Sequence, residues 1–150
     1  MTARTFDRDV RLAIYRTVVD TGRPPTAPEV AGELGVAISD VETAFGRLAD
    51  GHAIVLAPGT PYIWMANPFS AIPTPFEVEV GDRRYFANCI WDALGIPACL
   101  HADARVDTYC PDCSAPLALT VRSDELDATA EGVIHFAVPA AHWWDDIGST

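Results

Sequence analysis

The order of helix-like and strand-like segments in the first 65 residues constrains the fold more than any other feature of this chain. Apolar residues recur at helical spacing over residues 6–20, and a Thr-Gly-Arg-Pro-Pro sequence ends the pattern. Thr26 is placed to cap a second helix over residues 28–34, which stops at a glycine. Ser39, with a glutamate three residues later, has the capping-box pattern of a third helix that runs from this cap through Val41 to Gly51.

Two apolar runs follow these helices, at residues 53–56 and 62–65. The five residues between them include two prolines and a glycine, which predicts a β-hairpin. Three helices followed by a hairpin is the order of elements in a winged-helix module. We therefore expect a winged-helix-like N-terminal domain over residues 1–70, and a plain small helical core is the alternative.

Residues 67–75 hold three of the twelve prolines and few regular signals, so we place a connector and the domain boundary there. The second domain is then residues 76–150. Its predicted strands cover residues 76–80, 104–107, 117–121 and 132–138, with a helix between the first two. This pattern predicts a small mixed α/β domain with a mostly antiparallel sheet, and the whole chain is expected to be α+β.

The charge balance disfavours nucleic-acid partners. The chain has 21 acidic residues and 10 basic ones, all of them arginine, for a net charge of -11. The third predicted helix, which would read DNA in a winged-helix DNA-binding protein, carries Asp40, Glu42 and Asp50 against Arg47. A structural or dimerising use of this module, including a homodimer, is favoured over DNA binding.

The chain has the composition of a folded, soluble protein. Hydrophobic residues make up 49% of it, yet no run approaches the roughly 18 apolar residues of a membrane span. The first residues do not lead into an apolar signal core, so we expect a cytoplasmic protein without membrane partners. In a reducing compartment the four cysteines favour metal binding or thiol chemistry over a disulfide framework.

Cys89 and Asp92 are the strongest candidates for chemistry. They lie three residues apart in a run that extends from Tyr85 to Pro97, and on a helix they would share one face. A thiolate selects soft, thiophilic metals, whereas a carboxylate suits proton transfer. The pair therefore predicts the binding of a soft metal with proton movement beside it.

A second group of thiols surrounds the sequence Cys110-Pro111-Asp112-Cys113 between two predicted strands. A CxxC turn places two sulfurs close enough to chelate one ion or to form a small disulfide. Cys99 and His101 are candidates to complete a four-ligand zinc site with it. The alternative is a turn whose cysteines are merely small and half-buried.

These residues resemble the alkylmercury lyase (organomercurial lyase) family. The resemblance covers nearly the whole chain, from the winged-helix-like part through residues 81–98 and 104–106, Cys110-Pro111 and the strand after Pro116, to residues 143–147. Its most specific part is the Cys-x-x-Asp sequence followed by Gly-Ile-Pro.

The resemblance implies protonolysis of a carbon–mercury bond to give a hydrocarbon and Hg(II), without an organic cofactor. It assigns Cys89 as the mercury ligand and Asp92 as the proton relay and a further ligand of the metal. The substrate would be a small organomercurial or another thiophilic ligand. The family's second mercury-binding cysteine follows the segment matched by residues 143–147, and the sequence continues there to Thr150 without a cysteine. Cys99, Cys110 or Cys113 would have to lie near Cys89 to replace it.

Two other functions are compatible with the sequence. One is a metal- or thiol-responsive regulator, in which the winged helix binds DNA and the cysteine domain senses the ion. The other is a non-catalytic scaffold stabilised by zinc.

Overall fold

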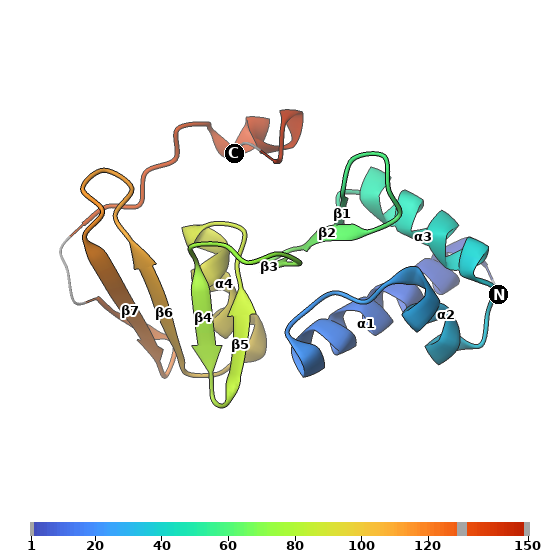
Figure 1. The fold of residues 1–150 in the computed structure, drawn as a ribbon, viewed down its shortest axis with the longest axis horizontal. Helices are drawn as coiled ribbons and strands as arrows, with labels where there is room; N and C mark the ends of the chain where they lie inside the picture. Colours follow the sequence, from blue (N-terminus) through green and yellow to red (C-terminus); the bar gives the residue numbers. More distant parts are fainter. Residues whose placement is uncertain (1, 129–131, 149–150) are drawn as a thin grey trace.

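The computed structural model describes residues 2–128 and 132–148, and it begins with three packed helices (Figure 1). They are α1 (Ala3–Thr21), α2 (Ala27–Leu34) and α3 (Ile38–Asp50). All three predicted helices are confirmed. None of the helices in the described residues has the length and apolar character needed to cross a membrane.

The end of α1 and both ends of α2 lie within one residue of the predicted positions, whereas α1 begins at Ala3, before the predicted start at about residue 6. Thr26 and Glu29 make a reciprocal capping box at the start of α2. Gly22 ends α1 with φ of 79°, in the left-handed region that favours glycine. A Cβ atom at Gly22 would lie 2.8 Å from the backbone oxygen of Arg84, so this position also needs a residue without a side chain. The end of α1 is thereby packed closely against the second half of the chain.

The predicted cap of α3 is wrong. The helix begins at Ile38 with Ala37 as its N-cap, and no side chain caps its amides. Ser39 lies inside the first turn, where its backbone oxygen accepts a hydrogen bond from the Thr43 hydroxyl at 2.8 Å. The helix starts before Ser39 because Val41, Ala44, Phe45 and Leu48 are buried on one face, and packing of that face outweighs the capping preference.

The predicted hairpin is present and gains a third strand. β1 (Val55–Leu56) pairs with β2 (Ile63–Ala66), and β2 pairs with β3 (Phe69–Ser70), all antiparallel. β3 lies within residues 67–75, which we expected to be a connector without regular structure. The division into domains 1–70 and 76–150 itself stays a prediction.

The second half of the chain is a five-stranded antiparallel sheet with one helix against it (Figure 1). In spatial order the strands are β5 (Arg83–Phe86), β4 (Glu77–Val80), β6 (Ala104–Tyr109), β7 (Pro116–Arg122) and β8 (Glu125–Ala128). The helix α4 (Ile90–Leu100) packs on β4 and β6. The predicted α+β class and the antiparallel sheet are confirmed, and β5 and β8 are additions to the predicted strands.

The strand predicted over residues 132–138 is wrong. These residues form no strand and lead into a short 3-10 helix, η1 (Ala140–Asp145). Val133 is 93% exposed, and Phe136 makes an edge contact with Trp91 of α4 at 6.1 Å between ring centroids. The apolar side chains of this segment therefore do not form part of a β-sheet face.

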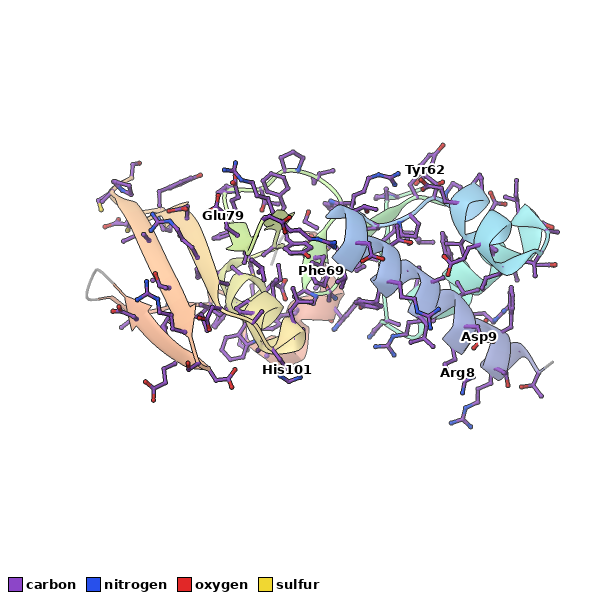
Figure 2. All side chains as sticks on the ribbon, turned by 90° about the horizontal axis from the view of Figure 1, so that it is seen from below. Arg8, Asp9, Tyr62, Phe69, Glu79 and His101 are labelled. Carbon is purple, nitrogen blue, oxygen red and sulfur yellow. The ribbon has the colours of Figure 1, made fainter. Side chains whose placement is uncertain are left out.

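One cluster of buried apolar side chains runs through both halves of the molecule. It includes Ile14 and Phe45 from the helices, Val78 and Val106 from the sheet, and Phe69 of β3. Figure 2 shows Phe69 between α1 and the strands of the second half. The sheet that carries α4 is thus anchored on the helical part by shared packing.

Polar contacts reinforce this anchoring at the end of α1. The Tyr85 hydroxyl donates to the backbone oxygen of Val19 at 2.8 Å, and the Arg83 guanidinium donates to the same oxygen. Arg83 also contacts the Asp20 carboxylate at 3.4 Å. Because Tyr85 and Arg83 belong to β5, these bonds fix the strand that leads into α4.

Candidate active site

Cys89 and Asp92 face each other at the start of α4. Cys89 is the N-cap residue, with extended backbone, and Asp92 lies in the first turn. The Cys89 Sγ lies 3.7 Å from Oδ2 of Asp92, with the thiol as donor. The structure brings the two side chains together as expected, although Cys89 precedes the helix instead of lying within it.

β5 and β3 set the position of Cys89. β5 ends at Phe86, and Ala87 then pairs with Phe69 of β3 in an isolated antiparallel bridge. Two residues later the chain enters α4 at Cys89. The sulfur is therefore placed by a sheet edge on one side and by a helix start on the other.

Burial raises the pKa of the Cys89 thiol above its ordinary value. The negative charge of Asp92 acts in the same direction. The backbone N–H groups of Asp92 and Trp91 point toward the sulfur and favour the thiolate, but they do not outweigh burial and form no capping hydrogen bond. Cys89 therefore keeps its proton until a base or a metal removes it.

The Asp92 carboxyl is also half-buried, and burial raises its pKa. Hydrogen bonds from Asn88 and Cys89 partly offset this shift. The Asn88 side-chain N–H also donates to Oδ1 of Asn67 at 3.0 Å. A carboxyl that takes up a proton more readily than usual, next to a thiol that can supply one, can receive and release that proton.

Tyr15 of α1 lies close to this pair. Its hydroxyl donates to the backbone oxygen of Asn67 at 2.8 Å. Burial raises the pKa of Tyr15, and the charges of Cys99 and Asp92 add to this effect while Arg11 opposes it. Tyr15, Asn67 and Asn88 therefore connect the helical half to Asp92.

Sequence analysis did not select these three residues. Asn88 was visible next to Cys89 in the conspicuous run, but no pattern marks its contact with Asn67. Tyr15 sits at an ordinary helical position, 52 residues before its hydrogen-bond partner. A contact between residues so far apart in the sequence leaves no local sequence pattern that could predict it.

Three aromatic side chains meet at the first turn of α4. Trp91 is 59% exposed and contacts Phe136, whose ring centroid lies 5.2 Å from that of Trp143. Farther along η1, Trp144 stacks on His52 at 4.0 Å and with ring planes 4° apart. The segment after the sheet thus returns to Trp91 of α4 and to the helical half.

The CxxC sequence forms the turn between β6 and β7. The backbone N–H of Ser114 donates to the oxygen of Cys110 at 2.8 Å, and the N–H of Cys110 donates to the oxygen of Ala115 at 2.8 Å. The backbone N–H groups of Cys113 and Asp112 and the Cys113 thiol hydrogen-bond the Cys110 sulfur, and they lower its pKa. All four cysteines are free thiols.

The predicted zinc site is not assembled. In residues 2–128 and 132–148, no three His, Cys, Asp or Glu side chains gather closely enough to hold a metal ion. Cys99 and His101, at the exposed end of α4, therefore do not complete a site with Cys110 and Cys113. For the same reason, none of these cysteines joins Cys89 and Asp92 as a second thiol ligand.

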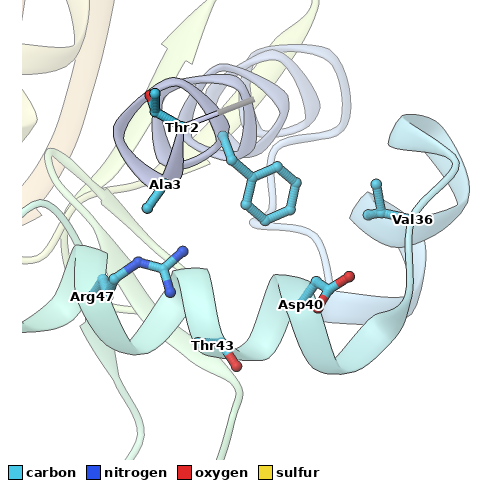
Figure 3. Close-up of a pocket in the computed structure, with 7 residues that line it drawn as sticks. Thr2, Ala3, Val36, Asp40, Thr43 and Arg47 are labelled. Carbon is cyan, nitrogen blue, oxygen red and sulfur yellow. The ribbon is translucent and has the colours of Figure 1, made fainter.

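Two surface hollows have neither Cys89 nor Asp92 in their walls. One is formed between the start of α1 and α3 and has Phe6, Asp40 and Arg47 in its wall (Figure 3). A second lies along α1 and is lined by Leu12, Tyr15, Arg16, Val19 and Asp20. The Cys89–Asp92 pair is instead a contact between two side chains at a helix start.

Residues 69–150 match the MerB family, described as alkylmercury lyase. The solved mercury-bound form of MerB2 is similar to this chain, with a TM-score of 0.62 and 25% sequence identity. The similarity covers 85% of this chain and 66% of that protein. The chain thus spans just under two thirds of the length of that solved structure.

Proposed function

This chain belongs to the alkylmercury lyase family, and we propose that it cleaves carbon–mercury bonds by protonolysis, with Cys89 binding mercury and Asp92 moving the proton. The 3.7 Å contact between the Cys89 sulfur and Oδ2 of Asp92 is the observation that carries the proposal. Mercury as the metal is supported by the similarity to a protein solved in its mercury-bound form.

The first step is transfer of the thiol proton. Cys89 donates toward Asp92, and the raised pKa of that carboxyl makes it a better proton acceptor than an exposed aspartate. The thiolate that remains is a soft ligand and binds the soft mercury atom of the organomercurial. The high pKa of Cys89 does not prevent this step, because metal binding itself favours the deprotonated sulfur.

The second step breaks the carbon–mercury bond. Electron density from the thiolate weakens this bond, the electron pair of the bond stays on carbon, and Asp92 delivers the proton to that carbon. The products are a hydrocarbon and mercury(II) bound to Cys89, and Asp92 is again a carboxylate. The proton that leaves Cys89 is the proton that the hydrocarbon gains, so the step needs no oxidant or reductant.

A thiol from solution can complete the mercury coordination. An organomercurial dissolved with a small thiol carries one thiolate opposite its organic group, so mercury has two sulfur ligands once Cys89 binds. This supply suits a site where the described residues bring no second cysteine to Cys89. The exposed ring of Trp91, with Phe136 against it, provides apolar surface for the organic group.

The test is release of benzene from phenylmercury by the reduced protein in the presence of glutathione, followed by gas chromatography. We expect release by the unchanged protein and by Cys99→Ser, because Cys99 is an exposed thiol at the opposite end of α4 from Asp92. We expect Cys89→Ser to lower release to the rate of glutathione alone. Equal release by Cys89→Ser and Cys99→Ser would overturn the proposal.

A further inference from the structure

We propose that Cys110 and Cys113 form a separate binding site for a soft, two-coordinate divalent cation, with Hg(II) as its best ligand. This site lies in the turn between β6 and β7, and it does not depend on lyase activity at Cys89. Binding replaces two thiol protons: Hg(II) and the two thiols give one S–Hg–S unit and two protons in solution.

The turn itself holds the two sulfurs together. Two backbone hydrogen bonds close it, from Ser114 to Cys110 and from Cys110 to Ala115, each 2.8 Å long. The Cys113 thiol reaches the Cys110 sulfur within hydrogen-bonding range. Because the chain is already folded into this loop, a metal that bridges the two sulfurs has little conformational entropy to remove.

The surroundings of Cys110 favour a thiolate. The backbone N–H groups of Asp112 and Cys113 both donate to its sulfur. This is the way in which a turn stabilises negative charge without a basic side chain. Residues 108–117 contain no Arg, and Asp112 adds a negative charge that attracts a cation.

The number of available ligands selects the type of metal. Zinc in structural sites takes four nitrogen or sulfur ligands. In the described ranges no third His, Cys, Asp or Glu side chain joins this pair. Two thiolates on their own satisfy a soft cation that prefers two ligands in a line, which is the usual geometry of Hg(II), and they balance its double charge.

Access to the turn is open. Cys113 is exposed and Cys110 is half-exposed, and Pro111, Asp112 and Ser114 between and beside them are exposed as well. The site therefore accepts an ion directly from solution or from a small thiol that carries it. Cys89, in contrast, lies half-buried at the start of α4.

The test uses the full chain in which Cys89→Ser and Cys99→Ser leave Cys110 and Cys113 as its thiols. This variant is titrated with mercuric chloride in excess glutathione, and bound mercury is measured by native mass spectrometry and by near-ultraviolet sulfur–mercury absorption. We expect one Hg(II) per chain. Adding Cys113→Ser should weaken retention about 100-fold, because the second sulfur acts at a high effective concentration.

Cys110→Ser in the same background is the second variant, and circular dichroism checks the fold of both. Equal retention by the two-thiol and one-thiol proteins would overturn the proposal. Zinc binding as tight as Hg(II) binding, or a zinc-bridged dimer, would overturn the two-coordinate assignment. Restoring Cys99 should leave retention unchanged.

Discussion

The two thiol regions of this protein differ in what controls their sulfurs. Cys89 lies half-buried at the start of α4, and removal from water raises its pKa. Cys110 lies in an open turn, and backbone hydrogen bonds lower its pKa. Both sulfurs receive backbone N–H groups, and each has a nearby aspartate whose charge raises its pKa, Asp92 for Cys89 and Asp112 for Cys110. The difference therefore comes from burial, which dominates at Cys89, and from the Cys113 thiol, which lowers the pKa of Cys110.

This difference in pKa suits Cys89 to bond cleavage and Cys110 to metal binding. A thiol that keeps its proton beside a carboxyl that accepts one holds the proton needed to break a carbon–mercury bond. A thiol that loses its proton easily is a good metal ligand but brings no proton for the carbon. The cysteines of this chain therefore suit two different tasks, bond cleavage at Cys89 and metal binding at Cys110 and Cys113.

The largest expected effect comes from Asp92→Asn. The amide cannot accept and return the proton, so benzene release from phenylmercury should fall about 100-fold or more. Mercury should still bind to Cys89, because the sulfur is unchanged. Gas chromatography measures the release, and intact mass measures the adduct.

Asp112→Asn is the matched control for that variant. It removes a carboxyl next to the other pair of thiols, and benzene release should not change. An equal loss in both variants would mean that the loss of one negative charge, and not the loss of the Asp92 contact with Cys89, lowers benzene release.

The second effect is a difference in alkylation rate. At pH 7 we expect iodoacetamide to modify Cys110 about 10-fold faster than Cys89, because the thiolate is the reactive form and Cys110 ionises at lower pH. Peptide mass spectrometry after timed quenching gives both rates in one sample. The rate at Cys89 should keep rising to higher pH than the rate at Cys110. Equal rates, or a faster reaction of Cys89, would remove the contrast between the regions.

A smaller effect is expected from Tyr15→Phe. The substitution removes the hydrogen bond to the backbone oxygen of Asn67 and should lower the free energy of unfolding by about 1 kcal/mol. Urea denaturation measures it. The control is Tyr62→Phe, because Tyr62 is 59% exposed and its substitution should have almost no effect. Equal effects of the two variants would show that the bond to Asn67 does not stabilise the buried region.

The smallest effect concerns Glu29, an exposed carboxyl that contrasts with Asp92. Bonds from Arg23 and Thr26 lower the pKa of Glu29 to about 2. Its folded pKa lies below its unfolded value, so its stabilisation is complete above pH of about 4.5 and is lost as the pH falls toward 2. Because the ion pair is exposed, Glu29→Gln should cost only about 0.5 kcal/mol at pH 7.

Thermal unfolding of the Glu29→Gln variant at several pH values checks this. The difference from the unchanged protein should shrink between pH 4.5 and 2. Glu33→Gln, one helical turn later on α2, is the control. A difference that stays constant with pH would show that the carboxylate charge is not what stabilises the capping box.

Local signals in the sequence were sufficient for the helical half and for the Cys89–Asp92 contact. Thr26, Glu29 and Gly22 act through neighbours in the chain, and a three-residue spacing puts Cys89 against Asp92. The prediction of Ser39 as the cap of α3 was wrong, because burial of the apolar face moved the start of the helix.

Tertiary contacts explain the remaining differences. The strand expected at residues 132–138 does not form, and Phe136 contacts Trp91 of α4. In the described residues, Cys99 and His101 at the end of α4 do not gather with Cys110 and Cys113 of the β6–β7 turn, so the zinc site stays a prediction. The roles of Tyr15 and Asn67 depend on contacts across more than fifty residues, for which a single sequence has no signal.

The most direct test removes the thiols of one region at a time and compares the two variants in the same reaction. A single turnover of phenylmercury with glutathione is followed for Cys110→Ser/Cys113→Ser and for Cys89→Ser, with benzene measured by gas chromatography and adducts by peptide mass. We expect benzene release at the unchanged rate from the first variant. From the second we expect intact phenylmercury on the Cys110 and Cys113 peptide, without benzene. Benzene from the Cys89→Ser variant, or none from the variant that keeps Cys89, would show that Cys89 does not supply the cleaving site.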